Sequence, residues 1–193
     1  MIDIEKSIKN FGLKGLHSFF VSDDGNCHKQ IFVNEPLNRL SPVNVKSFYG
    51  GHLPIPIHSS YFDEQTVVIK GHLMIFTFEE SLKDETELCW HLMNEWDEDN
   101  KVIGSSLIKE KTGRLYNKTD VFSLPAQTLR TFYCSPYAWT AWELSGLGNP
   151  AAKPRRFSNG PDILSDARCE FFEKGEAEEI LEKSGLVKWL VSA

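Results

Sequence analysis

The stretch "HSSYFDEQTVVIKG", residues 58–71, decides the fold that we expect for this chain. It places His58, Glu64 and Gly71 at a spacing typical of a metal-binding pair of strands, but Ser60 stands where a second imidazole would be expected. Side chains an even number of residues apart point to the same side of an extended strand. The stretch therefore predicts a polar wall, made by His58, Ser60 and Glu64, on one face of a β-structure.

Short β-rich runs surround this stretch from residue 16 to about 145, separated by turn signals such as "DDGN", "KTGR" and "SPY". The runs are "LHSFFV", "KQIFV", "VNVKSFY", "TVVIKG", "HLMIFTF", "VFSLP", "LRTFYC" and "AWTAWEL". Many short strands with turn signals predict a sandwich or a barrel. Gly71 separates two of the runs, where a turn with positive φ is expected. The segment "DETELCWHLMNEWDEDN" fits a helix or a strand, and we favour a strand that ends in an acidic loop.

Length and composition favour one domain over residues 1–193. Hydrophobic residues make up 41% and charged residues 25%, the balance of a globular protein. The formal net charge of -6 repels nucleic acid, so we expect no nucleic-acid partner. The short basic cluster of Lys153, Arg155 and Arg156 is interpreted as a solvated loop.

Cysteine usage and hydropathy indicate a cytoplasmic location and no membrane partner. Cys27, Cys89, Cys134 and Cys169 form no Cys-x-x-Cys pair, so we expect reduced thiols. No apolar run approaches the roughly 18 residues of a spanning helix. The N-terminus also contains no continuous apolar segment of a secretory signal.

Helices are predicted at both ends of the chain. Ile4, Ile8 and Phe11 repeat at helical spacing before Gly12, which predicts an N-terminal helical arm over residues 1–15.

A C-terminal helical extension is predicted over residues 150–193. Ile163, Ala167 and Phe171 share one face of a helix that ends at Gly175, and "EAEEILEKSG" predicts a second short helix.

Together with the later "DVFSLPAQTLRTF", the opening stretch resembles the cupin family. The first cupin motif runs Gly, five residues, His-x-His, three or four residues, Glu, six residues, Gly. His58, Glu64 and Gly71 match it, Ser60 replaces the second His, and Gly51 lies one residue too far upstream.

The second cupin motif contains Pro-x-Gly, two residues, His. Pro125 matches, Gln127 replaces the Gly, and Arg130 stands where the last His ligand belongs. The chain is therefore similar to a degenerate cupin whose metal ligands are partly lost. The resemblance covers a barrel core over residues 45–145. It implies an all-β barrel, a cupin-like jelly roll, with short flanking helices at the N- and C-termini.

The resemblance also raises the question of a metal. Metal-dependent cupins hold their ion with three imidazoles and a carboxylate, and only His58 and Glu64 remain here. A permanent guanidinium at Arg130 repels a divalent cation and is no ligand. We expect no cofactor on this account. A divalent metal at His58 and Glu64 would need His52 or His72 as its third ligand.

A guanidinium in an apolar barrel indicates a carboxylate or phosphate in the ligand, and aromatic faces are a stacking surface for sugar rings. The ligand-binding residues that we expect are Arg130, Ser60, Gln127, Phe132, Trp139 and Trp142. A second interpretation stays open, in which the aromatic residues and His58 belong to the core and Glu64 simply pairs with Arg130.

Two functions follow from these residues. The first is a small-molecule-binding protein that recognises a polar or anionic ligand, such as a carbohydrate, phosphate or carboxylate, in the barrel. The second is a metal-free sugar-nucleotide isomerase or epimerase, with His58 as the catalytic base and Glu64 orienting it. A metal-dependent dioxygenase or isomerase is a third, less favoured reading. Cupin barrels often pair through edge strands, so we also expect a homodimer.

Overall fold

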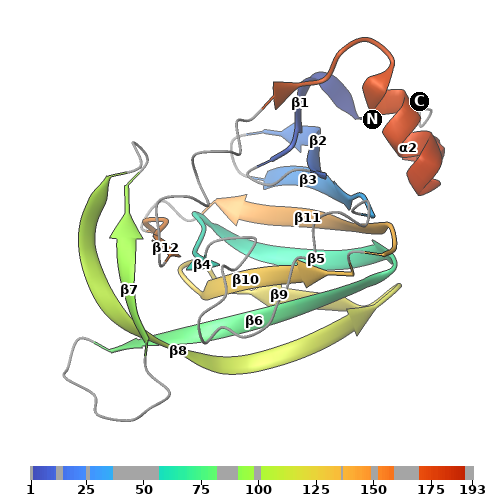
Figure 1. Ribbon diagram of the computed structural model, residues 1–193. Coiled ribbons are helices and arrows are strands. Elements are labelled where there is room, and N and C mark those ends of the chain that lie inside the picture. Colours follow the sequence, from blue (N-terminus) through green and yellow to red (C-terminus); the bar gives the residue numbers. More distant parts are fainter. Residues whose placement is uncertain are drawn as a thin grey trace.

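The computed structural model describes residues 2–11, 15–24, 27–36, 57–81, 91–97, 101–135, 137–148, 152–158 and 170–189. Antiparallel strands dominate these ranges and form two sheets (Figure 1). The seven-stranded sheet consists, in spatial order, of β13 (Glu170–Phe171), β1 (Asp3–Lys9), β2 (Leu16–Asp23), β3 (Cys27–Asn34), β11 (Thr140–Gly148), β5 (Phe62–Lys70) and β9 (Val121–Leu124).

The second sheet closes on itself, because β10 pairs with both β4 and β6. Its strands, in spatial order, are β10 (Leu129–Cys134), β4 (Ile57–His58), β12 (Arg156–Ser158), β7 (His91–Trp96), β8 (Val102–Asn117) and β6 (His72–Ser81). The two antiparallel sheets form the jelly-roll β-barrel that the sequence predicted. The segment "DETELCWHLMNEWDEDN", for which a strand was favoured over a helix, contains strand β7.

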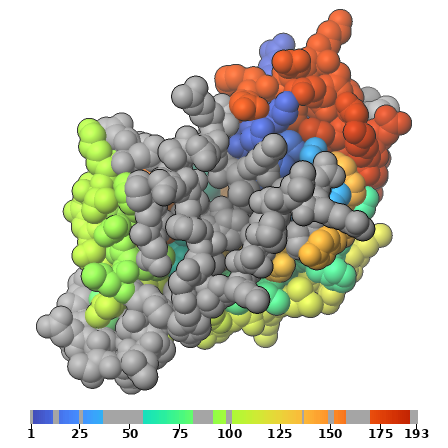
Figure 2. All heavy atoms as spheres, in the orientation of Figure 1, coloured from blue at the N-terminus to red at the C-terminus, as the bar shows by residue number. Residues whose placement is uncertain are grey.

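Three apolar clusters fill this architecture. One lies between the two sheets and joins residues such as Val68 and Trp142 of the seven-stranded sheet to Phe132 of the closed sheet. A second lies within the closed sheet around Ile57 and Phe157. The third packs helix α2 (Glu176–Ser184) and the following 3₁₀ turn (Val187–Trp189) against the other face of the seven-stranded sheet. In the space-filling view, α2 and β7 lie on opposite sides of the molecule (Figure 2).

The predicted N-terminal helix is wrong, because residues 3–9 form strand β1. Asp3 pairs with Phe20 of β2 and Ile8 with Ser18, with a bulge between the two pairs. Ile2 and Ile4, two residues apart, pack against the cluster beneath α2. A segment this short is marginal as an isolated helix, and the sheet edge satisfies its backbone groups instead.

The C-terminal prediction is confirmed in one part and wrong in another. The second helix is α2, which ends at Gly185 in the left-handed conformation. Phe171 of the first predicted helix lies instead in β13, opposite Ile8, and is 75% exposed. Ile163 and Ala167 of that helix lie outside the described residues.

Gly71 makes the turn between β5 and β6 with φ +71°, as its place between two apolar runs predicted. A Cβ atom there would lie 2.7 Å from the carbonyl oxygen of Trp139. Gly175 also has a positive φ, of +89°, but a Cβ atom there would meet nothing within 4 Å. Both glycines therefore have the left-handed backbone conformation, but only Gly71 also has neighbouring atoms too close for a Cβ atom.

We expect Gly175→Ala to cost about 1 kcal/mol, because the left-handed region penalises a Cβ atom. Gly71→Ala should cost clearly more, since the Trp139 carbonyl must also shift. Urea unfolding of the two variants measures the difference. Equal losses would mean that the close approach at Gly71 adds no cost.

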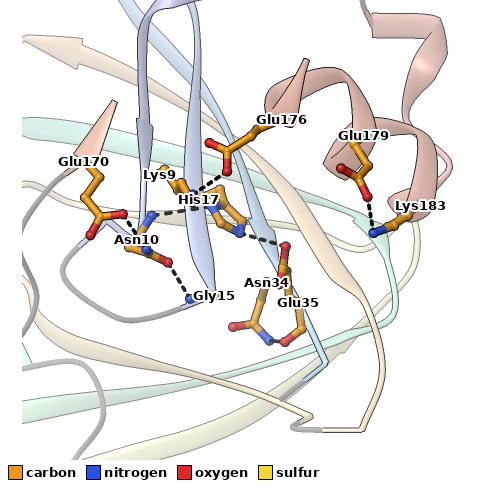
Figure 3. Close-up of polar contacts among 10 residues, drawn as sticks. All are labelled: Lys9, Asn10, Gly15, His17, Asn34, Glu35, Glu170, Glu176, Glu179 and Lys183. Atoms are coloured by element: carbon orange, nitrogen blue, oxygen red, sulfur yellow. Dashed lines mark hydrogen bonds and ion pairs between the residues drawn. The ribbon is translucent and has the colours of Figure 1, made fainter. Parts of the chain in front are cut away.

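Polar contacts hold the first strands against the C-terminal region (Figure 3). Lys9 Nζ lies 2.6 Å from Glu176 Oε1. The buried His17 ring accepts a hydrogen bond at Nδ1 from the Asn10 backbone N–H, so its proton is on Nε2 in the neutral ring. Nε2 lies 3.2 Å from Glu35 Oε1. This contact with His17 lowers the pKa of Glu35, although partial burial of the carboxyl group opposes the shift.

The lowered pKa makes this contact pH-dependent. A carboxyl group with a lowered pKa in the folded state stabilises the fold above its unfolded pKa and loses that contribution as pH falls through the folded value. The stability difference between wild type and Glu35→Gln should therefore shrink as pH falls below the ordinary value of 4.5. Urea unfolding across this range measures it. Glu5→Gln removes the same charge at an exposed position of β1, and an equal pH effect there would contradict the assignment to His17.

Candidate functional site

The structure brings His58, Glu64 and Arg130 to one region, from both sheets. His58 and Arg130 are directly opposite each other on β4 and β10, so their side chains lie on one face of the closed sheet. Glu64 comes from β5 of the other sheet. Burial alternates along β5, with Glu64 and Thr66 buried and the residues between and before them exposed, so the carboxylate faces the space between the sheets.

Glu64 and Arg130 form a buried ion pair across this space. Arg130 Nη2 donates a hydrogen bond to Glu64 Oε1, and the two side chains are 1% and 4% exposed. Arg130 Nη1 also donates to the Thr128 carbonyl oxygen at 3.2 Å. Burial lowers the pKa of Arg130, while the adjacent carboxylate opposes that shift. The structure thus contains the Glu64–Arg130 ion pair that the second interpretation of the sequence expected.

The pair leaves hydrogen-bonding capacity unused. Within the described residues, Glu64 Oε2 and Arg130 Nε are buried and have no hydrogen-bond partner. Buried polar atoms in folded proteins are nearly always bonded, and an unpaired one costs about 1–3 kcal/mol. One acceptor and one donor are therefore free to bind a polar group that enters this region.

Phe132 separates the ion pair from the apolar core. Its ring centroid lies 5.9 Å from the Arg130 guanidinium carbon and 5.7 Å from the His58 ring. On its other side, Phe132 lies 5.9 Å from Trp142, which stacks on Phe32 and is 1% exposed. Phe132 and Trp142 are both members of the core cluster between the sheets. Trp142 is thus a core residue, whereas Phe132 touches both the core and the polar region.

An aromatic pair that the sequence did not predict lies beside Glu64. Phe62, two residues before Glu64 on the same face of β5, stacks on His28 of β3 with centroids 5.2 Å apart and planes at 12°. Gly146 lies opposite both Glu64 and His28, and a Cβ atom there would lie 2.6 Å from the Phe62 Cβ. The period-two alternation of β5 could have indicated Phe62. His28 could not be found, because its position depends on the pairing of β3 with β11.

Other predicted site residues lie elsewhere. Ser60 makes a local turn, in which its hydroxyl contacts the backbone of Phe62. Gln127 is exposed in the β9–β10 turn with φ +66°. Trp139 packs in the cluster beneath α2, on the other face of the seven-stranded sheet. His72 is exposed and lies 2.9 Å from Asn117 Oδ1.

The donor set near Glu64 does not fit the divalent metal that the sequence left as a possibility. The carboxylate is neutralised by Arg130, and His72 is not brought to it. His52, the other candidate for a third ligand, lies outside the described residues. Across the ranges that the structure describes, no group of three or more His, Cys, Asp and Glu could hold an ion.

The same ranges contain no helix long and apolar enough to cross a membrane.

A cavity of about 510 Å³ adjoins Glu64 but lies mainly on the outer face of the seven-stranded sheet. Asp63 and Gln65, which flank Glu64 and point away from the barrel interior, are among its lining residues. Glu64 also lines this cavity, so the cavity and the polar region between the sheets meet at that residue.

Comparisons with known proteins agree with the fold. No family model and no curated protein sequence matches this chain. A cupin-like protein from Thermotoga maritima matches with 12% identity and a TM-score of 0.42, over 83% of this chain and 86% of that one. A cupin-2 domain protein from Rhodospirillum rubrum matches with 8% identity and a TM-score of 0.36, over 93% and 82%.

A hydroquinone 1,2-dioxygenase from Sphingomonas sp. TTNP3, with 4-hydroxybenzoate bound, matches with 11% identity and a TM-score of 0.39, over 67% of this chain and 64% of that one. The chain thus spans less than two thirds of that protein's length. Two of these three proteins are described as a cupin-like and a cupin-2 domain protein, the family that the two sequence motifs resemble. All of these TM-scores are below 0.5, so the functional argument depends on this chain's own residues.

The buried pair predicts strong coupling between Glu64 and Arg130. Arg130→Met leaves a buried carboxylate alone and Glu64→Leu leaves a buried guanidinium alone, and each should cost about 3–5 kcal/mol. The double variant replaces the pair with apolar groups of similar size and should cost far less than the sum. Chemical unfolding of the wild type, the two single variants and the double variant gives the four free energies of unfolding of this double-mutant cycle. Additive losses would show that the two groups do not stabilise each other.

Proposed function

We propose that this protein binds a small neutral, hydroxylated molecule, of the carbohydrate class, between its two sheets at Glu64 and Arg130. The observation that carries this proposal is the pair of buried unpartnered atoms, Glu64 Oε2 and Arg130 Nε. A hydroxyl group can donate to the first and accept from the second, which a purely apolar ligand cannot do.

Charge balance favours a neutral ligand over the anionic one also considered from the sequence. The Arg130 guanidinium is already compensated by Glu64. A carboxylate or phosphate at the same place would leave a buried excess of negative charge, which costs several kcal/mol. The stacked Phe62 and His28 rings beside Glu64 support the same ligand class, since sugar rings pack on aromatic faces.

Thermal shift with a panel of neutral hexoses and pentoses, beside the corresponding uronic acids, tests this proposal. A ligand at about 100 times its Kd should add roughly 2.7 kcal/mol of stability. We expect stabilisation by at least one neutral sugar and less by its uronic acid. The folded Glu64→Leu/Arg130→Met double variant should lose the shift.

Two results would contradict the proposal. One is a sugar-induced shift of equal size in the double variant, which places the ligand elsewhere. The other is a consistent preference for uronic acids, which would mean that Arg130 recognises an anion in spite of Glu64.

A second candidate function is proton transfer in a metal-free sugar isomerase or epimerase. The observation that favours it is the placement of His58 directly opposite Arg130 on the neighbouring strand. In this role the His58 imidazole would remove a proton next to a carbonyl group, and Arg130 would stabilise the developing negative charge. Transfer of solvent deuterium into a keto-sugar, followed by mass spectrometry, tests it. Exchange that persists in His58→Gln would exclude His58 as the base.

The homodimer and the cytoplasmic location stay predictions of the sequence.

A further inference from the structure

The basic cluster noted in the sequence lies beside a second cavity, on the side of the closed sheet. This cavity has a volume of about 580 Å³. Among its lining residues are Thr77, Glu80, Lys111, Lys153 and Arg155. Its lining includes neither Glu64 nor Arg130, although it includes Thr128, whose carbonyl oxygen accepts a hydrogen bond from Arg130.

Arg155 is a half-buried, fixed part of the wall, so the interpretation of the basic cluster as a solvated loop holds for the exposed Lys153 but not for Arg155. Its guanidinium donates to both oxygens of Glu80, at 2.5 and 2.9 Å, and to both oxygens of Glu95, at 2.6 and 2.9 Å. Its guanidinium carbon lies 4.8 Å from the centre of the Phe157 ring. These contacts raise the pKa of Arg155 and lower that of Glu80.

The clamp at Arg155 positions Lys153. The Arg155 backbone N–H donates to the Ser59 hydroxyl at 3.0 Å, and its carbonyl accepts from the Ser59 N–H at 2.9 Å. Main chain and side chain of Arg155 are therefore both fixed, and Lys153 is only two residues upstream. Lys153 is exposed and lines the cavity.

Lys111 reaches the cavity through an irregularity in β8. Phe78 pairs with Glu110 and Thr77 pairs with Thr112, so Lys111 is the extra residue of a β-bulge. Bulges re-aim a side chain and occur often beside binding sites. The hydroxyl groups of Thr77 and Thr112 contact each other at 2.7 Å next to this bulge.

The two lysines supply uncompensated positive charge. Several lysines of the described chain have carboxylate partners, among them Lys109, which is two residues from Lys111 and lies 3.0 Å from Glu79. Lys111 and Lys153 have no ion pair or hydrogen bond with the rest of the described chain. Arg155, by contrast, is already matched by two carboxylates. Within the described residues, a protein of net charge -6 thus has two cations without a partner beside one cavity.

We propose that this cavity binds a phosphate group, held by Lys111 and Lys153. Lysine binds phosphate as a point charge, and two such charges from separate segments match a doubly charged oxyanion. The volume of the cavity exceeds what a single phosphate needs, so the group would be part of a small phosphorylated compound.

Isothermal titration with inorganic phosphate and with glycerol 3-phosphate tests the site, and unphosphorylated glycerol serves as the ligand control. We expect both phosphates to bind, glycerol not to bind, and added salt to weaken the binding. Tighter binding of glycerol 3-phosphate than of inorganic phosphate would support a phosphorylated compound as the ligand. Lys111→Met and Lys153→Met should each weaken binding roughly threefold to fivefold, and the double variant should weaken it about tenfold or more.

Lys109→Met is the matched control, because it removes one positive charge from the same strand at a residue that is paired with Glu79. It should change phosphate binding by less than about twofold. An equal loss in Lys109→Met would overturn the proposal, since net charge alone would then explain the effect. Absence of phosphate binding by the wild-type protein, or unchanged binding by the folded double variant, would also overturn it. The Lys111→Met/Lys153→Met variant should keep the sugar-induced thermal shift, which separates this site from the proposed sugar site.

Discussion

The ion pair between Glu64 and Arg130 is the interaction on which the interior of this jelly roll depends. Glu64 belongs to the seven-stranded sheet and Arg130 to the closed sheet, so their contact joins the two layers of the fold. Removing two charges from water is expensive, and only close pairing with further hydrogen bonds offsets that cost. The positions of β5 and β10 relative to each other are therefore constrained by this ion pair as well as by the apolar cluster around Phe132 and Trp142.

A second set of charges has a similar role in the closed sheet. Strands β4 and β12 contain only two and three residues, which gives them few ladder hydrogen bonds. Arg155 compensates for this by binding Glu80 of β6 and Glu95 of β7 with its side chain and Ser59 with its backbone. The short strands are thus held between their neighbours by one guanidinium group.

The sequence predicted the parts of the fold that local patterns determine. Gly71 was identified because a turn between two apolar runs needs positive φ, and His58, Glu64 and Arg130 were identified because motif spacing and strand alternation assign them to one interior. Strand β1 was missed because Ile4 and Ile8 fit a helical period equally well, and only pairing with β2 decides between the two.

The Arg155 clamp could not be predicted, since its carboxylates lie 75 and 60 residues away in the chain. The Phe62–His28 stack was missed for the same reason. It forms only because β3 and β5 both pair with β11, where Gly146 leaves room for the Phe62 side chain.

The two buried or half-buried arginines show why the binding sites are where we propose them. Arg155 donates hydrogen bonds from Nε, Nη1 and Nη2 to two carboxylates, so its guanidinium stabilises the fold. In our proposal, the nearby Lys111 and Lys153 bind the ligand instead. Arg130 has one carboxylate and one carbonyl oxygen, and its Nε and the second oxygen of its partner Glu64 stay unpaired in the described chain. A saturated guanidinium can only hold the fold together. A guanidinium whose charge is balanced by a carboxylate, but which still has an unused hydrogen-bond donor, can also bind a neutral polar ligand.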